Sequence, residues 1–196
     1  MVKPNEFHLD AASTSTSGTV TTTDSFGFMT ESDYEADGTR VAFGYLMAAP
    51  DDQPVALLTG LDLVFSGYAS SEAGVDTTMF SFGINGALGV RFGAGRSPVF
   101  LDLLAQLGLG MTALDMTSNT MIGTGTLARL AVGGSLRPGV WLDDQQKFGL
   151  YGLIGVESTM ESGTVTITPS IGPGLSVDYE LSASATYVGL GFTGKF

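Results

Sequence analysis

The sequence contains no cysteine and few charged residues, and both features limit the classes of protein to which it can belong. Without cysteine, the chain can form neither a disulfide framework nor a thiolate site. Only 14% of its 196 residues are charged, whereas ordinary soluble domains carry about 25%. Basic residues are the scarcest, with 8 Lys and Arg against 20 Asp and Glu, and the net charge of −12 argues against nucleic acid as a partner.

Long apolar runs are also missing, although hydrophobic residues make up 43% of the chain. No window comes near the roughly 18 uninterrupted apolar residues of a membrane helix. This combination is typical of a transmembrane β-barrel, in which apolar residues alternate with others. Residues 1–6 lack the apolar core of a signal peptide. We expect that a signal peptide is absent from this chain because it has been removed on export, and the alternative is a cytoplasmic protein that never had one.

The last ten residues show the alternation most clearly. They place apolar side chains on one face of a strand, with small or polar residues between them, at Val188, Leu190, Phe192 and Phe196. A wholly apolar face suits a strand in contact with lipid. The stretch resembles the C-terminal strand of bacterial outer-membrane β-barrels, which ends in phenylalanine after alternating apolar residues.

The same two-residue period recurs along the chain and predicts eight strands. We expect them at about residues 5–14, 38–49, 55–67, 80–92, 99–112, 124–137, 148–157 and 177–196. Short turns alternate with longer polar loops, which we place at residues 15–37, 68–76, 115–123 and 158–176. Pro138 cannot donate a ladder hydrogen bond, so we place it at a bulge or turn that ends the sixth strand.

The predicted fold is an all-β, eight-stranded antiparallel up-and-down transmembrane β-barrel with short periplasmic turns and long external loops. We expect a single domain over residues 1–196. Aromatic girdles are expected at both membrane edges, one from Phe7, Tyr45, Phe92, Trp141, Phe148 and Phe196, the other from Phe65, Tyr68, Phe80 and Tyr179. The alternative is a soluble, lipocalin-like barrel. Its exterior would be polar, whereas the polar faces here carry mostly small residues that suit a narrow interior.

With the apolar faces outward, five of the eight basic residues point into the barrel and can meet inward acids that include Glu6. Buried charges are costly unless they are paired. We therefore predict an interior charge network of Asp10, Arg40, Asp62, Arg91, Asp102, Arg129, Arg137, Glu157 and Lys195. It would form two layers, with Arg40, Asp62, Arg129 and Glu157 toward the outside. The network is either a structural plug or a gate, for which inward glycines leave room for water.

No catalytic, cofactor-binding or metal-binding residue is predicted. His8, the only histidine, shares an inward face with Asp10, but it lies near the periplasmic start of its strand, whereas surface hydrolases work at the external rim. No His or Cys cluster exists for a metal. Carboxylates in the first and last loops could bind Ca²⁺ or Mg²⁺, but their spacing matches no EF-hand and a solvated acidic surface is the alternative. We therefore expect that the protein is not an enzyme.

By pattern and terminal motif, the whole chain resembles the small eight-stranded outer-membrane barrels, the OmpX-like, OmpA-transmembrane-like and OmpW-like group. The resemblance implies a monomer in the bacterial outer membrane with both termini in the periplasm. It implies contact with outer-membrane lipids and lipopolysaccharide, and with the barrel-assembly machinery through the C-terminal strand. The implied role is structural or a surface interaction. The alternatives are a small channel for hydrophobic or small solutes and an outer-membrane hydrolase.

Overall fold

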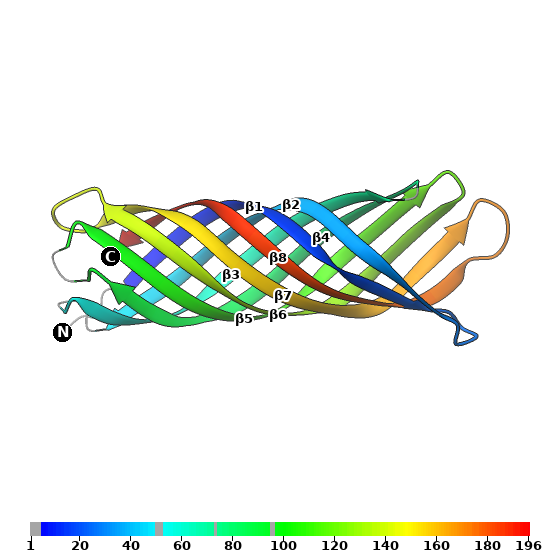
Figure 1. Ribbon diagram of the computed structural model, residues 1–196, viewed down its shortest axis with the longest axis horizontal. Coiled ribbons are helices and arrows are strands. Elements are labelled where there is room, and N and C mark those ends of the chain that lie inside the picture. Colours follow the sequence, from blue (N-terminus) through cyan, green and yellow to red (C-terminus); the bar gives the residue numbers. More distant parts are fainter. Residues whose placement is uncertain (1–4, 50–52, 73, 95–96) are drawn as a thin grey trace.

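Eight antiparallel strands close into one ring in the computed structural model, which describes residues 5–49, 53–72, 74–94 and 97–196. Each strand pairs with its neighbours in sequence, and the last pairs with the first (Figure 1). The strands are β1 (Asn5–Thr23), β2 (Met29–Ala49), β3 (Val55–Glu72), β4 (Val75–Phe92), β5 (Val99–Ser118), β6 (Met121–Trp141), β7 (Phe148–Pro169) and β8 (Leu175–Lys195). The predicted up-and-down barrel is confirmed. Residues 1–4, and parts of the predicted turns at 50–54 and 93–98, lie outside the described residues.

An apolar belt surrounds the half of the barrel that lies next to the chain termini. Every second side chain in this half points outward, and most of these are large and apolar, which leaves Leu190 75% and Leu109 68% exposed. Other members are Leu9, Phe43, Leu61, Leu88, Leu107, Val132 and Ile154. A soluble barrel has the reverse arrangement. Among the described residues, no helix is long and apolar enough to cross a membrane.

Aromatic rings form a girdle at the edge of this belt beside the termini. Phe7 lies 5.9 Å from Phe192 and 6.3 Å from Phe196 between ring centroids, and Tyr45 lies 6.4 Å from Phe196. Three predicted girdle members are wrong, because Trp141 and Tyr179 point inward and are 8% and 4% exposed, and Tyr68 packs against a buried cluster in the interior. The reason for Trp141 is that β6 continues to this residue, which keeps it on the inward face.

The predicted long loops are mostly strand. Only residues 24–28 connect β1 to β2, and only residues 170–174 connect β7 to β8. The Thr-rich segments that we expected to be loops pair continuously across these hairpins, consistent with the preference of β-branched residues for strands. Pro138 is likewise inside β6, opposite Leu101 of β5. The pairing with β7 lapses at residues 137–138 and resumes in the same register at Gly139, so Pro138 forms neither a turn nor a bulge.

The polarity of the two faces reverses at the end of the barrel opposite the termini. There Ser182 and Glu180 of β8 point outward, while Leu181 and Tyr179 point inward. Inward side chains of seven strands form one cluster, which we call the apolar plug: Val20, Tyr34, Ala36, Met79, Leu114, Leu127, Val165, Val177, Tyr179, Leu181 and Ala183. Burial raises the pKa of Tyr179 to about 12, so its phenol stays neutral.

Leu190→Lys is expected to lower the free energy of unfolding by about 2–4 kcal/mol in phospholipid vesicles, because it places a charge in the middle of the apolar belt. Ser182→Lys lies on the same face of β8 beyond the belt and should cost less than about 1 kcal/mol. Urea titrations followed by Trp141 emission measure both values. Equal costs at the two positions would contradict a lipid-facing belt.

Candidate functional site

The half of the interior next to the termini holds a cluster of buried charges, which we call the inner network. Its members are Glu6, His8, Asp10, Arg40, Asp62, Arg91, Asp102, Arg137 and Lys195. β1 contributes three of them at every second position, since alternate residues of a strand share one face. All are buried except Lys195, which is partly buried.

Arg91 is the best-paired member of the inner network. Its Nε and Nη2 donate to the two carboxylate oxygens of Asp102 at 2.7 and 2.8 Å, and its Nη1 donates to Glu6 Oε1 at 2.6 Å. The guanidinium carbon also lies 4.6 Å from the Phe100 ring centroid and 5.5 Å from that of Trp141. A bidentate carboxylate contact is among the stronger hydrogen-bonded pairs in proteins. Arg91 thus joins β1, β4 and β5 inside the barrel.

Asp10 is the second centre of the inner network. Its carboxylate oxygens lie 3.1 Å from Arg40 Nη1 and 3.4 Å from Arg137 Nη2, and the Tyr151 hydroxyl donates to Oδ2 at 3.3 Å. The Arg40 guanidinium in turn lies 4.8 Å from the ring centroid of Tyr187. One carboxylate therefore links β2, β6 and β7 to β1.

Asp62 is the partner of the only histidine. His8 Nε2 lies 3.1 Å from Asp62 Oδ1, and Gln106 Nε2 donates to Oδ2 at 2.9 Å. Arg137 Nη2 is 3.7 Å from the same Oδ2. The shared inward face of His8 and Asp10 on β1 therefore does not make them partners, because His8 meets Asp62 over Gly44 of the intervening strand β2, which is the neighbour of both.

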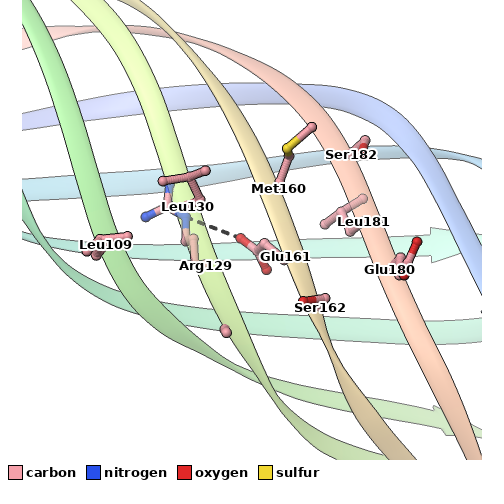
Figure 2. A pocket seen from close by; sticks show the side chains of 10 residues that line it. Leu109, Arg129, Leu130, Met160, Glu161, Ser162, Glu180, Leu181 and Ser182 are labelled. Atoms are coloured by element: carbon pink, nitrogen blue, oxygen red, sulfur yellow. Dashed lines mark ion pairs between the residues drawn. The ribbon is translucent and has the colours of Figure 1, made fainter.

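A second, separate ion cluster lies further from the termini. Arg129 of β6 pairs with Glu157 and, at 3.2 Å, with Glu161, both from β7. Figure 2 shows Arg129 and Glu161 lying toward each other on neighbouring strands. Glu161 was expected in the last loop, but β7 continues through it and keeps it on the inward face. We call these three residues the distal triad.

The two predicted layers are therefore divided differently in the structure. Arg40 and Asp62, expected beside Arg129 and Glu157, pair instead within the inner network. The cause is the stagger of the barrel. If one starts at Asn5 and passes from each residue to its paired residue on the next strand, one complete circuit of the barrel returns to β1 at Ser15 and not at Asn5. Residues equally far from their turns consequently lie at different heights.

The inward glycines leave less room for water than their number indicates. A Cβ atom on Gly155 would lie 2.1 Å from the Tyr187 ring, and one on Gly191 would lie 2.2 Å from the Tyr151 ring. Gly139 is covered in the same way by Phe100. Rings packed against bare backbone therefore fill the space beside these three glycines.

Four further side chains belong to the site. Phe100, Gln106, Tyr151 and Tyr187 contact the inner network. Their inward parity was readable from the strand pattern, but their partners on other strands were not. Within the described ranges, no group of three or more His, Cys, Asp or Glu side chains could hold a metal ion.

A groove of about 360 Å³ runs along the barrel wall and is lined mainly by β6, β7 and β8 (Figure 2). Its lining combines apolar side chains of the belt, such as Leu130 and Met160, with Ser162 and Glu180 beyond it. The groove therefore marks the boundary at which the outward face turns polar.

Comparison with solved structures identifies the fold. Neisserial surface protein A is 16% identical, with 97% of each chain covered and a TM-score of 0.51. The outer membrane protein OprG from Pseudomonas aeruginosa is 14% identical, covering 97% of this chain and 96% of its own, with a TM-score of 0.50. No protein-family model and no curated protein matches the sequence. The chain thus has the fold of the small eight-stranded outer-membrane β-barrels.

Arg91→Met is expected to lower the free energy of unfolding by about 3–5 kcal/mol, because it leaves buried Asp102 without its cation and leaves Glu6 with only the contact to Lys195 at 3.7 Å. The combined variant Glu6→Gln, Arg91→Met, Asp102→Asn should recover most of this loss, since it removes both buried carboxylates together with Arg91, and Lys195, which also contacts Glu6, is partly exposed to solvent. Lys147→Met, at an exposed turn residue, serves as the control and should stay within about 0.5 kcal/mol. Urea titration in vesicles measures all three. A loss below about 1 kcal/mol for Arg91→Met would show that the network is not structural.

Proposed function

We propose that this protein is a closed β-barrel of the bacterial outer membrane, with a structural or surface-interaction role and no solute path through its centre. The observation that carries this proposal is that the interior is filled at successive levels. The inner network and its aromatic rings occupy one half, and the apolar plug occupies the other, with the distal triad as a further ion cluster. A channel would require both the buried ion pairs and the apolar cluster to rearrange.

The proposed orientation places both termini in the periplasm. The start of β1 and the end of β8 lie at the same end of the barrel, where Glu6 pairs with Lys195 beside the aromatic girdle (Figure 1). The strands at the other end extend beyond the belt with mostly polar outward faces, which suits exposure to water outside the cell, and the hairpin tips also expose Phe26, Phe28 and Ile171. The belt would contact outer-membrane lipids, and the polar rim above it would meet lipopolysaccharide.

The C-terminal strand supports the proposed recognition by the barrel-assembly machinery. On β8, Val188 and Leu190 are exposed on the outward face, Phe192 is half-buried among the girdle rings and Phe196 follows at the end. The Phe196 amide donates to the Asn5 carbonyl at 3.0 Å, so the same strand that carries the motif also closes the ring. We propose that the closed ring is a monomer.

Catalysis is not part of the proposal. His8 is 0% exposed and is held between β1 and β3 by its contact with Asp62. A general base must reach its substrate within hydrogen-bond distance, and a side chain enclosed at this depth has no such access. The role of His8 in this proposal is that of a network member.

The closed interior predicts that the protein is electrically silent. In planar bilayers bathed in concentrated KCl, the purified protein should produce no discrete conductance steps, because no water-filled path crosses the inner network and the apolar plug. Liposome flotation and a heat-modifiable gel shift of the same preparation establish insertion and folding. Reproducible ohmic openings would favour the small-channel alternative.

The proposed orientation predicts unequal labelling of two single-cysteine variants in intact cells. The absence of native cysteine makes this experiment clean. Ser170→Cys, in the hairpin connection opposite the termini, should react with a bulky membrane-impermeant maleimide. Asp144→Cys, in the β6–β7 connection, should react only after the outer membrane is permeabilised. The reverse pattern would contradict the orientation.

A further inference from the structure

The pairing between β2 and β3 does not extend to the end of β2 at the β1–β2 hairpin. β2 pairs with β1 from Met29 to Met47, but its pairing with β3 begins only at Asp37, opposite Ala69. Residues 29–36 of β2 therefore have one paired side and, within the described chain, no ladder partner on the other. The facing end of β3, residues 70–72, pairs only with β4.

The stagger of the barrel explains this free edge. A circuit of the ring returns to β1 ten residues further along, at Ser15 instead of Asn5. Neighbouring hairpins therefore end at different heights, and β1–β2 extends past β3. Figure 1 shows the β1–β2 hairpin projecting from the far end of the barrel. An exposed edge presents backbone N–H and C=O groups that can pair with another strand.

After Met29, the outward side chains of this edge are all acidic. Glu31, Asp33 and Glu35 follow one another at every second residue, Asp37 continues the row at the first position paired with β3, and all four are exposed. None of the ion pairs within the described residues includes any of these carboxylates. Their neighbours on β1 are serine and threonine. The edge thus offers alternating backbone groups together with a row of negative charge.

A groove lies where β2 and β3 separate. It has a volume of about 400 Å³ and is lined by residues of β1, β2 and β3, which include Ser15, Ser17, Glu35, Asp37 and Ser70. The groove therefore extends from the free edge of β2 to the fork, the point near Asp37 at which β2 and β3 separate. A segment laid along residues 29–36 would run into it without a break.

We propose that the free edge of β2 binds an extended cationic peptide segment as an additional strand. Lysine or arginine side chains at alternate positions of the segment lie against the four carboxylates, and the end of the segment enters the groove at the fork. In this mode, main-chain hydrogen bonds supply affinity and alternate side chains supply specificity. A second copy of this chain is a poor occupant, because edge-to-edge pairing would bring acidic rows together.

This inference names a site and a class of partner for the proposed surface interaction. It rests on the surface-interaction half of the proposed function and not on the closed-barrel half. Failure of peptide binding would leave the closed-barrel half intact, because conductance tests that half separately. The competing explanation is that the acidic side chains merely protect an exposed edge from aggregation. That explanation predicts no binding and is separated from the proposal by the following experiment.

The folded barrel in nanodiscs is titrated with a fluorescent peptide of about eight residues in which Lys and Thr alternate, and binding is followed by anisotropy. The matched control peptide has the same composition with its lysines in one block. We expect the alternating peptide to bind about tenfold more tightly, because only its spacing matches a strand face. Equal affinity for both peptides, or no binding of either, would overturn the proposal.

Two charge-matched variants locate the site. Glu31→Gln, Asp33→Asn, Glu35→Gln should weaken binding of the alternating peptide by about tenfold, since exposed ion pairs contribute modestly and three are lost. The control Asp115→Asn, Asp178→Asn, Glu180→Gln removes three outward acids away from this edge and should change affinity by less than about twofold. Equal weakening by both variants would show a general charge effect and overturn the proposal.

Backbone pairing is tested with two N-methylated forms of the alternating peptide, methylated either at odd or at even positions. Successive amides of a strand point to opposite edges, so one form should lose binding and the other should retain it. Retention by both forms would exclude an added strand. Self-association of the barrel through this edge in sedimentation experiments, without peptide binding, would assign the edge to a second copy and overturn the proposal.

Discussion

The closure of β8 on β1 is the constraint on which the rest of the structure depends. Inside a bilayer, backbone N–H and C=O groups have no water to bond with, so a sheet must close on itself. Here the ring closes over a long antiparallel ladder, and the Phe196 amide adds a contact to Asn5. Closure also fixes which side chains face inward, because alternate residues of every strand then enter one narrow space. Both the charged interior and the apolar exterior follow from it.

The narrow interior explains why its charges occur as shared pairs. Arg91 is held by two carboxylates, and Asp10 by two guanidinium groups and a phenol. Each charge removed from water needs such partners, since an uncompensated buried ion costs several kcal/mol. Beyond the apolar belt, the surroundings of the barrel wall change from lipid to water. There the outward side chains are polar and the inward side chains are apolar. The apolar plug is the core of that protruding part.

The sequence pattern was sufficient for much of this architecture. The number of strands, the inward and outward parity and most of the inward charges could be read from two-residue alternation. Loops were the weak point, because the segment after Thr14 and the segment around Glu161 are polar and alternate in hydroxyl residues instead of apolar ones. Polarity there reflects contact with water and not the absence of a strand. The same truncation of strands placed Trp141 and Tyr68 in girdles, although both point inward. Tyr179 lay within the predicted last strand, and its place in a girdle was wrong because it shares the inward face of Tyr187.

The sequence by itself determined the local features of this protein, namely which residues alternate and which face of each strand is apolar. These features are local because a strand's side chains alternate whatever its neighbours are. Only the tertiary structure decided which charges meet, that His8 contacts Asp62 instead of Asp10, and that β2 outruns β3 to leave an unpaired acidic edge. Those features depend on the stagger accumulated around the whole ring, and no single strand encodes it.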